Sequence, residues 1–188
     1  MVQKTKHKNA LFFYISSSIV SSIFFVSSCS LISDYSSNIL VSNVIDGDTF
    51  ESDNKKYRIL GIDTPEVYDS KNNFLPTTGL QYFYGKLASN VASELLLNKW
   101  IEIESLKTDN YNRLITKVTI NNKIDFSSYM VKNGYAKVRY ISNNKNSLFY
   151  YYDNEYINNL NMLEEEAKLN KRGFWRETKD NINKIYPS

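Results

Sequence analysis

The chain has 188 residues, of which 42% are apolar, a length that indicates one domain with an appended segment. It carries 23 lysine and arginine residues against 20 aspartate and glutamate residues, a net charge of +3. Lys4, Lys6 and Lys8 account for this excess, because residues 1–28 contain no acidic residue. The rest of the chain is neutral overall, which excludes a protein that coats nucleic acid with a uniformly cationic body.

The histidine and cysteine content limits the available chemistry. His7 and Cys29 are the only residues of their kinds, so neither type occurs from residue 30 onward. This excludes histidine acid–base catalysis, a cysteine nucleophile, zinc sites and intramolecular disulfides in that part of the chain. Catalysis there would depend on carboxylates, arginines, lysines, tyrosines and an oxygen-liganded metal.

The N-terminal segment has the layout of an export signal. Three lysines precede Leu11 to Val26, an apolar and serine-rich run that is shorter than the ~20 residues of a membrane-spanning helix. Small residues then lead to Cys29, an arrangement that resembles a bacterial lipoprotein signal, in which the cysteine becomes the acylated N-terminus. An uncleaved membrane anchor is the alternative, and both interpretations place the domain outside the cytoplasm.

These features predict the organisation of the chain. We expect a lipoprotein signal peptide at 1–28, a tether from the lipidated Cys29 to residue 37, a folded domain at 38–177 and a C-terminal tail at 178–188. The expected location is the extracellular face of the cell membrane, with attachment through the lipid anchor.

Alternating apolar residues and turn signals predict a β-rich first half. Strands are expected at 41–45, 49–51 and 55–62, with turns at 46–48 and 53–54. Asp63-Thr64-Pro65 then ends the third strand, because proline has no amide hydrogen to donate to a sheet. The segment 67–77 is polar and irregular.

Helical spacing begins after this segment. Thr78 and Gln81 form a capping-box pair before a helix whose apolar stripe consists of Leu80, Tyr84, Leu87, Val91 and Leu95. The remaining expected elements are strands at 100–103 and 114–120, a helix from Asp125 to Gly134, an extended segment at 135–141 and a helix from Asp153 to Gly173. Short, mostly antiparallel strands with inserted helices predict a mainly β, α+β fold, a five-stranded OB-type barrel with about three helices.

Four short segments combine acidic residues, arginines and turn residues, at 46–49, 57–60, 63–66 and 108–113. Asp48 and Asp63 each lie at the end of a predicted strand, next to a turn. Adjacent strand ends can bring the two carboxylates to one point, where they and a backbone carbonyl would form an oxygen-only site. Ca²⁺ or Mg²⁺ is the natural ion for such a site.

Two arginines extend this pattern. Arg58 lies on a strand that leads to the same end, Arg113 follows a turn, and two guanidinium groups beside a divalent ion form a phosphate clamp. Glu66, three residues after Asp63, is placed to hold an attacking water. Each piece alone also has a structural explanation, since Asp-Gly is a common hairpin turn and Asp-Thr-Pro suits a strand end with an Asx turn.

Taken together, in this order and at this spacing, the four segments resemble the staphylococcal nuclease (thermonuclease) family. The resemblance extends to Tyr84-Gly85, Gly134 to Val138 and Gly173-Phe174-Trp175, and it covers residues 38–177. It implies an OB-fold nuclease that uses Ca²⁺ and cuts DNA and RNA to leave 3′-phosphate ends. With the N-terminal signal, it predicts a membrane-anchored, exported, calcium-dependent nuclease, which we expect to be a monomer.

The resemblance also implies roles for the acidic residues. Asp48 and Asp63 would bind the ion through their carboxylates, and Thr64 would bind it through its backbone carbonyl. Asp46 would support the metal ligands without binding the ion itself.

Further roles concern the substrate. Arg58 and Arg113 would hold the phosphate, and Glu66 would act as the general base or position the attacking water. Tyr111 and Tyr140 fall where the family contacts the nucleotide.

Some positions depart from the family pattern. Asn112 stands where glycine is usual, although asparagine tolerates the left-handed backbone of such a turn. Asn110 stands where a basic residue is common, Ser142 stands where a second aromatic residue is expected after Tyr140, and the 67–77 segment is longer than expected. These changes would affect substrate affinity or base preference, whereas the residues expected to bind the metal ion and the phosphate are all present.

An aromatic run near the last predicted helix has two interpretations. Its members are Phe149, Tyr150, Tyr151, Tyr152 and Tyr156. They can stack on bases, or they can pack into the core and a partly exposed aromatic surface. Aromatic residues at helical spacing favour the second interpretation.

Two other functions compete with the nuclease. A catalytically inactive OB-fold lipoprotein would bind nucleic acid or protein without cutting it. The presence of Asp48, Asp63 and Glu66 favours the enzyme, since such a binding domain has no need of them. A solute-binding lipoprotein is less favoured, because the chain is short for two lobes.

Overall fold

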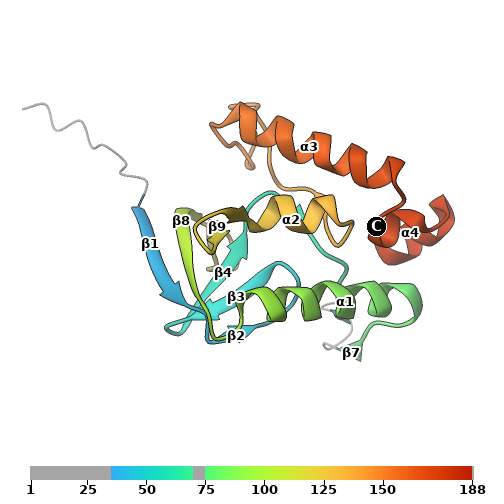
Figure 1. Cartoon of the computed structure of the whole chain (residues 1–188), viewed down its shortest axis with the longest axis horizontal. Helices are drawn as coiled ribbons and strands as arrows, with labels where there is room; N and C mark the ends of the chain where they lie inside the picture. The colour runs from blue at the N-terminus through green and yellow to red at the C-terminus, as the bar shows by residue number, and fades with distance from the viewer. Residues whose placement is uncertain (1–34, 70–74, 188) are drawn as a thin grey trace, which may run out of the picture. The chain divides into compact units, whose positions relative to one another are not determined.

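The computed structural model describes residues 35–69 and 75–187 (Figure 1). These residues belong to one structural unit, Ser33–Ser188. The predicted signal peptide, Cys29 and most of the predicted tether lie outside the described residues. Among the helices of the described part, none has both the length and the apolar character needed to cross a membrane.

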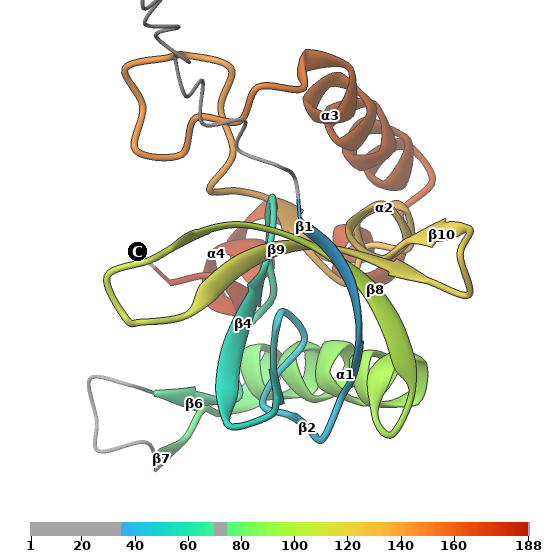
Figure 2. The ribbon, with the colours of Figure 1, turned by 90° about the vertical axis from the view of Figure 1, so that its left-hand side faces the viewer.

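A curled β-sheet that forms a half-barrel is the centre of the fold (Figure 2). Its strands are β1 (Tyr35–Leu40), β2 (Asn43–Val44), β3 (Thr49–Ser52), β4 (Lys55–Ile59), β8 (Trp100–Thr108), β9 (Leu114–Ile120) and β10 (Ile124–Asp125). The strand order is β1-β8-β9-β4-β3-β2, and β10 pairs with β9. Only β4 and β9 pair in parallel among the described strands of this sheet. The expected α+β fold of OB type is confirmed.

The third predicted strand is interrupted. β4 ends at Ile59, and Gly61 has a φ of +77°, a conformation that glycine adopts easily because it has no Cβ. The chain therefore turns, and β5 (Ile62–Asp63) leaves the main sheet to pair with β11 (Lys137–Val138). This break sets the position of Asp63.

β1 begins before residue 38, the predicted start of the domain. Half of its residues are polar, and it pairs with β8 along its whole length, from Tyr35 opposite Ser105 to Leu40 opposite Trp100. Pairing with a long neighbouring strand, rather than its own hydrophobic pattern, makes this segment a strand.

Four α-helices and a 3₁₀ segment are present in the described residues. They are α1 (Gly79–Leu96), α2 (Phe126–Lys132), α3 (Asn154–Leu169), the 3₁₀ segment (Gly173–Arg176) and α4 (Lys179–Ile185). As predicted, Asp125 and Asp153 start α2 and α3, accepting hydrogen bonds from the Ser128 N–H at 2.7 Å and the Tyr156 N–H at 2.9 Å. Thr78 makes no side-chain cap bond, so the predicted capping box at α1 is wrong.

α1 lies against the core through small residues, and the hairpin of β6 (Tyr68–Asp69) and β7 (Leu75–Pro76) precedes it. The buried face of α1 consists of Tyr84, Gly85, Ala88, Ser89, Ala92 and Leu96. Apart from Tyr84, the predicted apolar stripe is only partly buried. A Cβ at Gly85 would lie 2.7 Å from the Pro65 carbonyl oxygen, so glycine allows the helix to approach the backbone before Glu66.

The predicted C-terminal tail folds into α4. Ile185 is fully buried, and it packs with Tyr84 of α1 and Phe174 of the 3₁₀ segment. Tyr186, just after the helix, donates a hydrogen bond from its hydroxyl to the Asp63 backbone carbonyl at 2.9 Å. The helix has few apolar residues, so hydrophobic periodicity does not reveal it.

Candidate active site

The turn between β2 and β3 carries the first acidic residues of the site. Asp46 Oδ1 accepts a hydrogen bond from the Asp48 N–H at 3.0 Å, which closes the turn. A Cβ at Gly47 would lie 2.7 Å from Thr64 Cγ2 and 2.9 Å from Ala88 Cβ. The turn therefore packs directly against Thr64 and α1, and only glycine leaves room for this contact.

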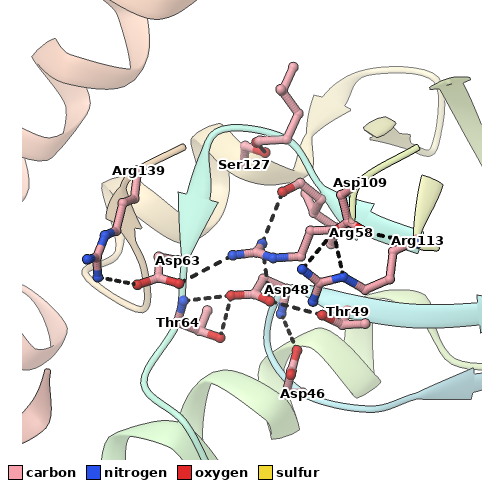
Figure 3. Close-up of polar contacts among 12 residues, drawn as sticks. Asp46, Asp48, Thr49, Arg58, Asp63, Thr64, Asp109, Arg113, Ser127 and Arg139 are labelled. Carbon is pink, nitrogen blue, oxygen red and sulfur yellow. Dashed lines mark hydrogen bonds and ion pairs between the residues drawn. The ribbon is translucent and has the colours of Figure 1, made fainter. Parts of the chain in front are cut away.

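Asp48 is buried and connects this turn to the segment after β5 (Figure 3). Its Oδ2 accepts hydrogen bonds from the Thr64 N–H at 2.7 Å and from the Thr64 hydroxyl at 3.0 Å. Its Oδ1 accepts a hydrogen bond from the Thr49 hydroxyl at 3.1 Å and lies 3.1 Å from Arg58 Nη1. One carboxylate thus joins two turns that are 16 residues apart in the chain.

Arg58, on β4, brings the two predicted metal ligands together. Its Nη1 lies 3.1 Å from Asp48 Oδ1, and its Nη2 lies 3.3 Å from Asp63 Oδ1. The Arg58 side chain is buried, and Nη1 also donates to the Ile59 carbonyl at 3.1 Å. Burial opposes the guanidinium charge, but the charges of Asp48 and Asp63 outweigh it and raise the pKa of Arg58. One guanidinium group therefore bridges both carboxylates.

Sequence reasoning missed a second arginine that contacts Asp63. Arg139 Nη1 lies 3.1 Å from Asp63 Oδ2, and the Arg139 N–H donates to the Gly61 carbonyl at 3.0 Å. Figure 3 shows Arg139 and Arg58 reaching Asp63 from different directions. The available signal was a basic residue directly before Tyr140, but only the pairing of β5 with β11 brings it to the carboxylate.

Four carboxyl groups share this site, and their surroundings raise the pKa of Asp46, Asp63 and Glu66. Desolvation, followed by the charge of Asp48, raises the pKa of Asp46 to about 8 and that of Glu66 to about 7. The same two causes raise the pKa of Asp63. Negative charge is therefore unfavourable here without further compensation, and such a site favours the binding of a cation.

The donors at the site fit a hard, oxygen-liganded cation. Asp48 and Asp63 supply carboxylate oxygens, and the described residues contain neither histidine nor cysteine. Within the same residues, no group of three or more His, Cys, Asp and Glu is arranged to hold a metal ion. Carbonyl and water oxygens would complete the shell, which Ca²⁺ and Mg²⁺ both accept. The role of the Thr64 carbonyl stays a prediction.

The turn between β8 and β9 orients Arg113. Asp109 Oδ1 accepts hydrogen bonds from the N–H groups of Tyr111 and Arg113, both at 2.9 Å. Its Oδ2 lies 2.8 Å from both Arg113 Nε and Arg113 Nη2. Desolvation opposes the charge of Asp109, but these hydrogen bonds outweigh it and lower the pKa of Asp109. Asn112 has a φ of +60°, so asparagine adopts the left-handed conformation in place of the usual glycine.

Arg113 faces the same site as Arg58. The charges of the two arginines partly offset the rise in the pKa of Glu66. Figure 3 shows the guanidinium group of Arg113 directed toward the region of Asp48 and Arg58. Both predicted phosphate-binding arginines are therefore at the site, and each is already paired with a carboxylate.

The two predicted nucleotide-contacting tyrosines lie at the exposed rim. Tyr111 is 80% exposed, and its ring centroid lies 5.2 Å from Arg113 Cζ. The ring centroid of Tyr140 lies 5.1 Å from Arg139 Cζ and 5.8 Å from Arg58 Cζ. Each ring is thus exposed beside a guanidinium group, an arrangement suited to binding a base and its phosphate.

Comparison with known proteins finds one family model and several relatives that match this chain. A family model described as staphylococcal nuclease homologue matches residues 56–177. An uncharacterized protein of Methanocaldococcus jannaschii is 35% identical over 155 residues, which cover 72% of this chain and 70% of that protein. Endonuclease YncB of Bacillus subtilis is 28% identical over 148 residues, which cover 75% of this chain and 63% of that protein, less than two thirds of its length. An uncharacterized endonuclease of Escherichia coli O157:H7 is 26% identical over 141 residues, which cover 73% and 76% of the two chains.

Proposed function

Because the chain belongs to the staphylococcal nuclease family, we propose that it is a nuclease that hydrolyses the phosphodiester bonds of DNA and RNA. The observation that carries this proposal is the buried Arg58 in contact with both Asp48 and Asp63, with Glu66 and Arg113 at the same site. Relatives named endonuclease support the same activity.

The proposed reaction needs positive charge beside the phosphate. Attack on phosphorus gathers negative charge on the equatorial oxygens, and the guanidinium groups of Arg58 and Arg113 would stabilise that charge. Asp109 holds the Arg113 side chain through Nε and Nη2. The carboxylate of Glu66 would position a water and accept its proton. Expulsion of the 5′-oxygen would leave a 3′-phosphate end.

The proposed cofactor is Ca²⁺, held by the carboxylates of Asp48 and Asp63 and the backbone carbonyl of Thr64, with Asp46 behind them. When bound, a divalent cation stabilises the charge that develops on the phosphate. The oxygen-only donor set supports this choice, because hard cations prefer carboxylate, carbonyl and water ligands.

A cleavage assay tests the activity and its metal dependence. The purified full-length chain is incubated with a labelled single-stranded oligonucleotide, with Ca²⁺, with Mg²⁺ or with a chelator. We expect product with Ca²⁺ and none with the chelator, and phosphatase treatment should remove a phosphate from the 3′ end of the product. Equal cleavage with Ca²⁺ and with the chelator would exclude metal dependence, and no product with any ion would exclude the nuclease.

Export and lipid attachment through Cys29 form a separate part of the proposal. Their support is the N-terminal sequence pattern, and they would place a monomeric nuclease at the extracellular face of the cell membrane. Metabolic labelling with a palmitate analogue should label the wild-type chain but not Cys29→Ala. Equal labelling of both chains, or no labelling of either, would exclude the lipid anchor.

A domain that binds nucleic acid or a protein without cutting is the second candidate. One observation favours it, because every carboxylate oxygen of Asp48 and Asp63 contacts a donor of the protein itself. Such a network can be purely structural. Tight binding of the oligonucleotide without product, in the presence of any divalent ion, would favour this second function.

A further inference from the structure

The chain after Tyr140 folds back and brings Phe149 to the rim of the site. Ser142, where a second aromatic residue is expected, donates its N–H to the Phe149 carbonyl at 2.8 Å and accepts from the Tyr151 N–H at 2.8 Å. The ring centroids of Tyr140 and Phe149 lie 5.1 Å apart, with an interplanar angle of 55°. The folded-back loop therefore supplies an aromatic partner for Tyr140 that the local sequence lacks.

The loop over residues 142–151 is held by hydrogen bonds within the loop and by one from β8. It is drawn in orange next to α3 (Figure 2). Ser147 Oγ accepts from the Phe149 N–H at 3.1 Å, and Lys107 Nζ on β8 donates to the Leu148 carbonyl at 2.5 Å. These bonds hold the Phe149 backbone in place before any ligand binds, which lowers the entropic cost of using its ring in recognition.

Burial separates the members of the aromatic run. Tyr151 and Tyr156 are 3% and 7% exposed and belong to the core, whereas Phe149 is 43% exposed although its ring packs on Tyr140. The favoured interpretation of the run, core packing with a partly exposed aromatic surface, therefore holds, and Phe149 belongs to the exposed part.

Tyr140 connects Phe149 to the arginines of the site. The guanidinium groups of Arg58 and Arg139 contact Asp63. The ring of Tyr140 lies beside these two groups, and the ring of Phe149 packs against Tyr140. A single strand of nucleic acid presents a matching alternation of phosphate charge and aromatic base.

From this geometry we propose that Phe149 is a base-stacking residue, which binds one nucleobase together with Tyr140, next to the phosphate held by the arginines. This proposal rests on the proposed nuclease function, and the stacked base would be an unpaired one. In a duplex the faces of the bases are already stacked, so an aromatic side chain reaches them only after unpairing.

Oligonucleotide binding by variants of the full chain tests this proposal. A fluorescent single strand is titrated in chelator, which prevents cleavage, and KM and kcat are measured separately with Ca²⁺. We expect Phe149→Ala to weaken binding and raise KM about tenfold, the effect of losing one base stack, with little change in kcat. Phe149→Trp should retain binding. Leu148→Ala is the matched control, because Leu148 is 83% exposed in the same loop and should not affect binding.

An oligonucleotide with abasic sites distinguishes stacking from other effects. Without bases to stack on, the wild type and Phe149→Ala should bind it equally. Equal affinity and equal KM of the two proteins for the intact strand would overturn the inference, and so would a tenfold loss that persists on the abasic strand. A wild-type chain that neither binds nor cuts the strand would overturn the proposed nuclease function, so the two failures are distinguishable.

Discussion

The centre of the site and its rim are held together in different ways. In the centre, Asp48, Arg58 and Asp63 are at most 9% exposed, and Arg58 contacts both carboxylates. At the rim, the Arg139 side chain is 54% exposed. Asp63 shows the difference within one residue, since one of its oxygens contacts the buried arginine and the other contacts the exposed one.

This comparison separates two roles that a salt bridge can have. Removing one partner of a buried ion pair leaves an uncompensated charge without water, whereas an exposed pair contributes little because solvent replaces the lost contact. We therefore expect substitutions in the centre to affect both folding and turnover, and substitutions at the rim to affect mainly the grip on substrate.

Arg58→Ala should have the largest effect. It leaves Asp48 and Asp63 buried without their shared partner, which should lower the free energy of unfolding by ~3–5 kcal/mol. It also removes the proposed donor to the reacting phosphate, which should lower kcat by a few hundredfold, ~3–4 kcal/mol. Urea denaturation and cleavage kinetics measure the two effects. Lys56→Ala is the control on the same strand, because its side chain is 57% exposed. A fully active and stable Arg58→Ala protein would contradict this view of the centre.

Glu66→Gln should come next, and it should separate turnover from stability. The substitution keeps the shape of the side chain but removes its ability to accept a proton, so kcat should fall about a hundredfold. The free energy of unfolding should not fall, because desolvation and the neighbouring carboxylates disfavour the charge of Glu66 in the folded protein. Glu94→Gln, an exposed position on α1, is the control. Unchanged kcat would mean that Glu66 does not serve as the base.

Asp109→Ala should have an intermediate effect, because it acts through Arg113. Without Asp109 the guanidinium group loses its two carboxylate contacts, and the resulting misplacement should lower kcat about tenfold. Asn110→Ala in the same turn should leave kcat unchanged. If Asp109→Ala changed stability but not kcat, Asp109 would serve only to close the turn.

Arg139→Ala should have the smallest effect on the folded state. Its ion pair with Asp63 is exposed on the arginine side, so the free energy of unfolding should fall by at most ~1 kcal/mol. The comparison with Arg58→Ala by urea denaturation is direct, since both arginines contact the same carboxylate. A loss as large as that of Arg58→Ala would remove the distinction between centre and rim.

Parts of the site that depend on neighbouring residues can be predicted from the sequence. Asp48 and Asp63 stand at strand ends beside turns, and the structure brings both to Arg58 as that pattern suggests. The starts of α2 and α3 follow in the same way, because Asp125 and Asp153 accept hydrogen bonds from residues three positions later.

Other parts depend on residues far away in the chain, and periodicity contains no information about them. Arg139 contacts Asp63 across 76 residues, and Asp63 takes its position because the predicted third strand breaks at Gly61. β1 becomes a strand only through β8, and α4 becomes a helix only where Ile185 enters the core. Sequence reasoning therefore names most acids and arginines of the site but not the contacts that arrange them.

The hydrogen bond from Tyr186 to the Asp63 carbonyl makes the end of the polypeptide part of the scaffold of the acidic centre. Proteolytic trimming before Lys179 would remove this donor, and it would empty the place that Ile185 fills beside Tyr84 and Phe174. Loss of residues 179–188 would thus disturb the acidic centre without a cut near the acids. Shortened versions made for crystallisation or engineering should retain the chain through Tyr186.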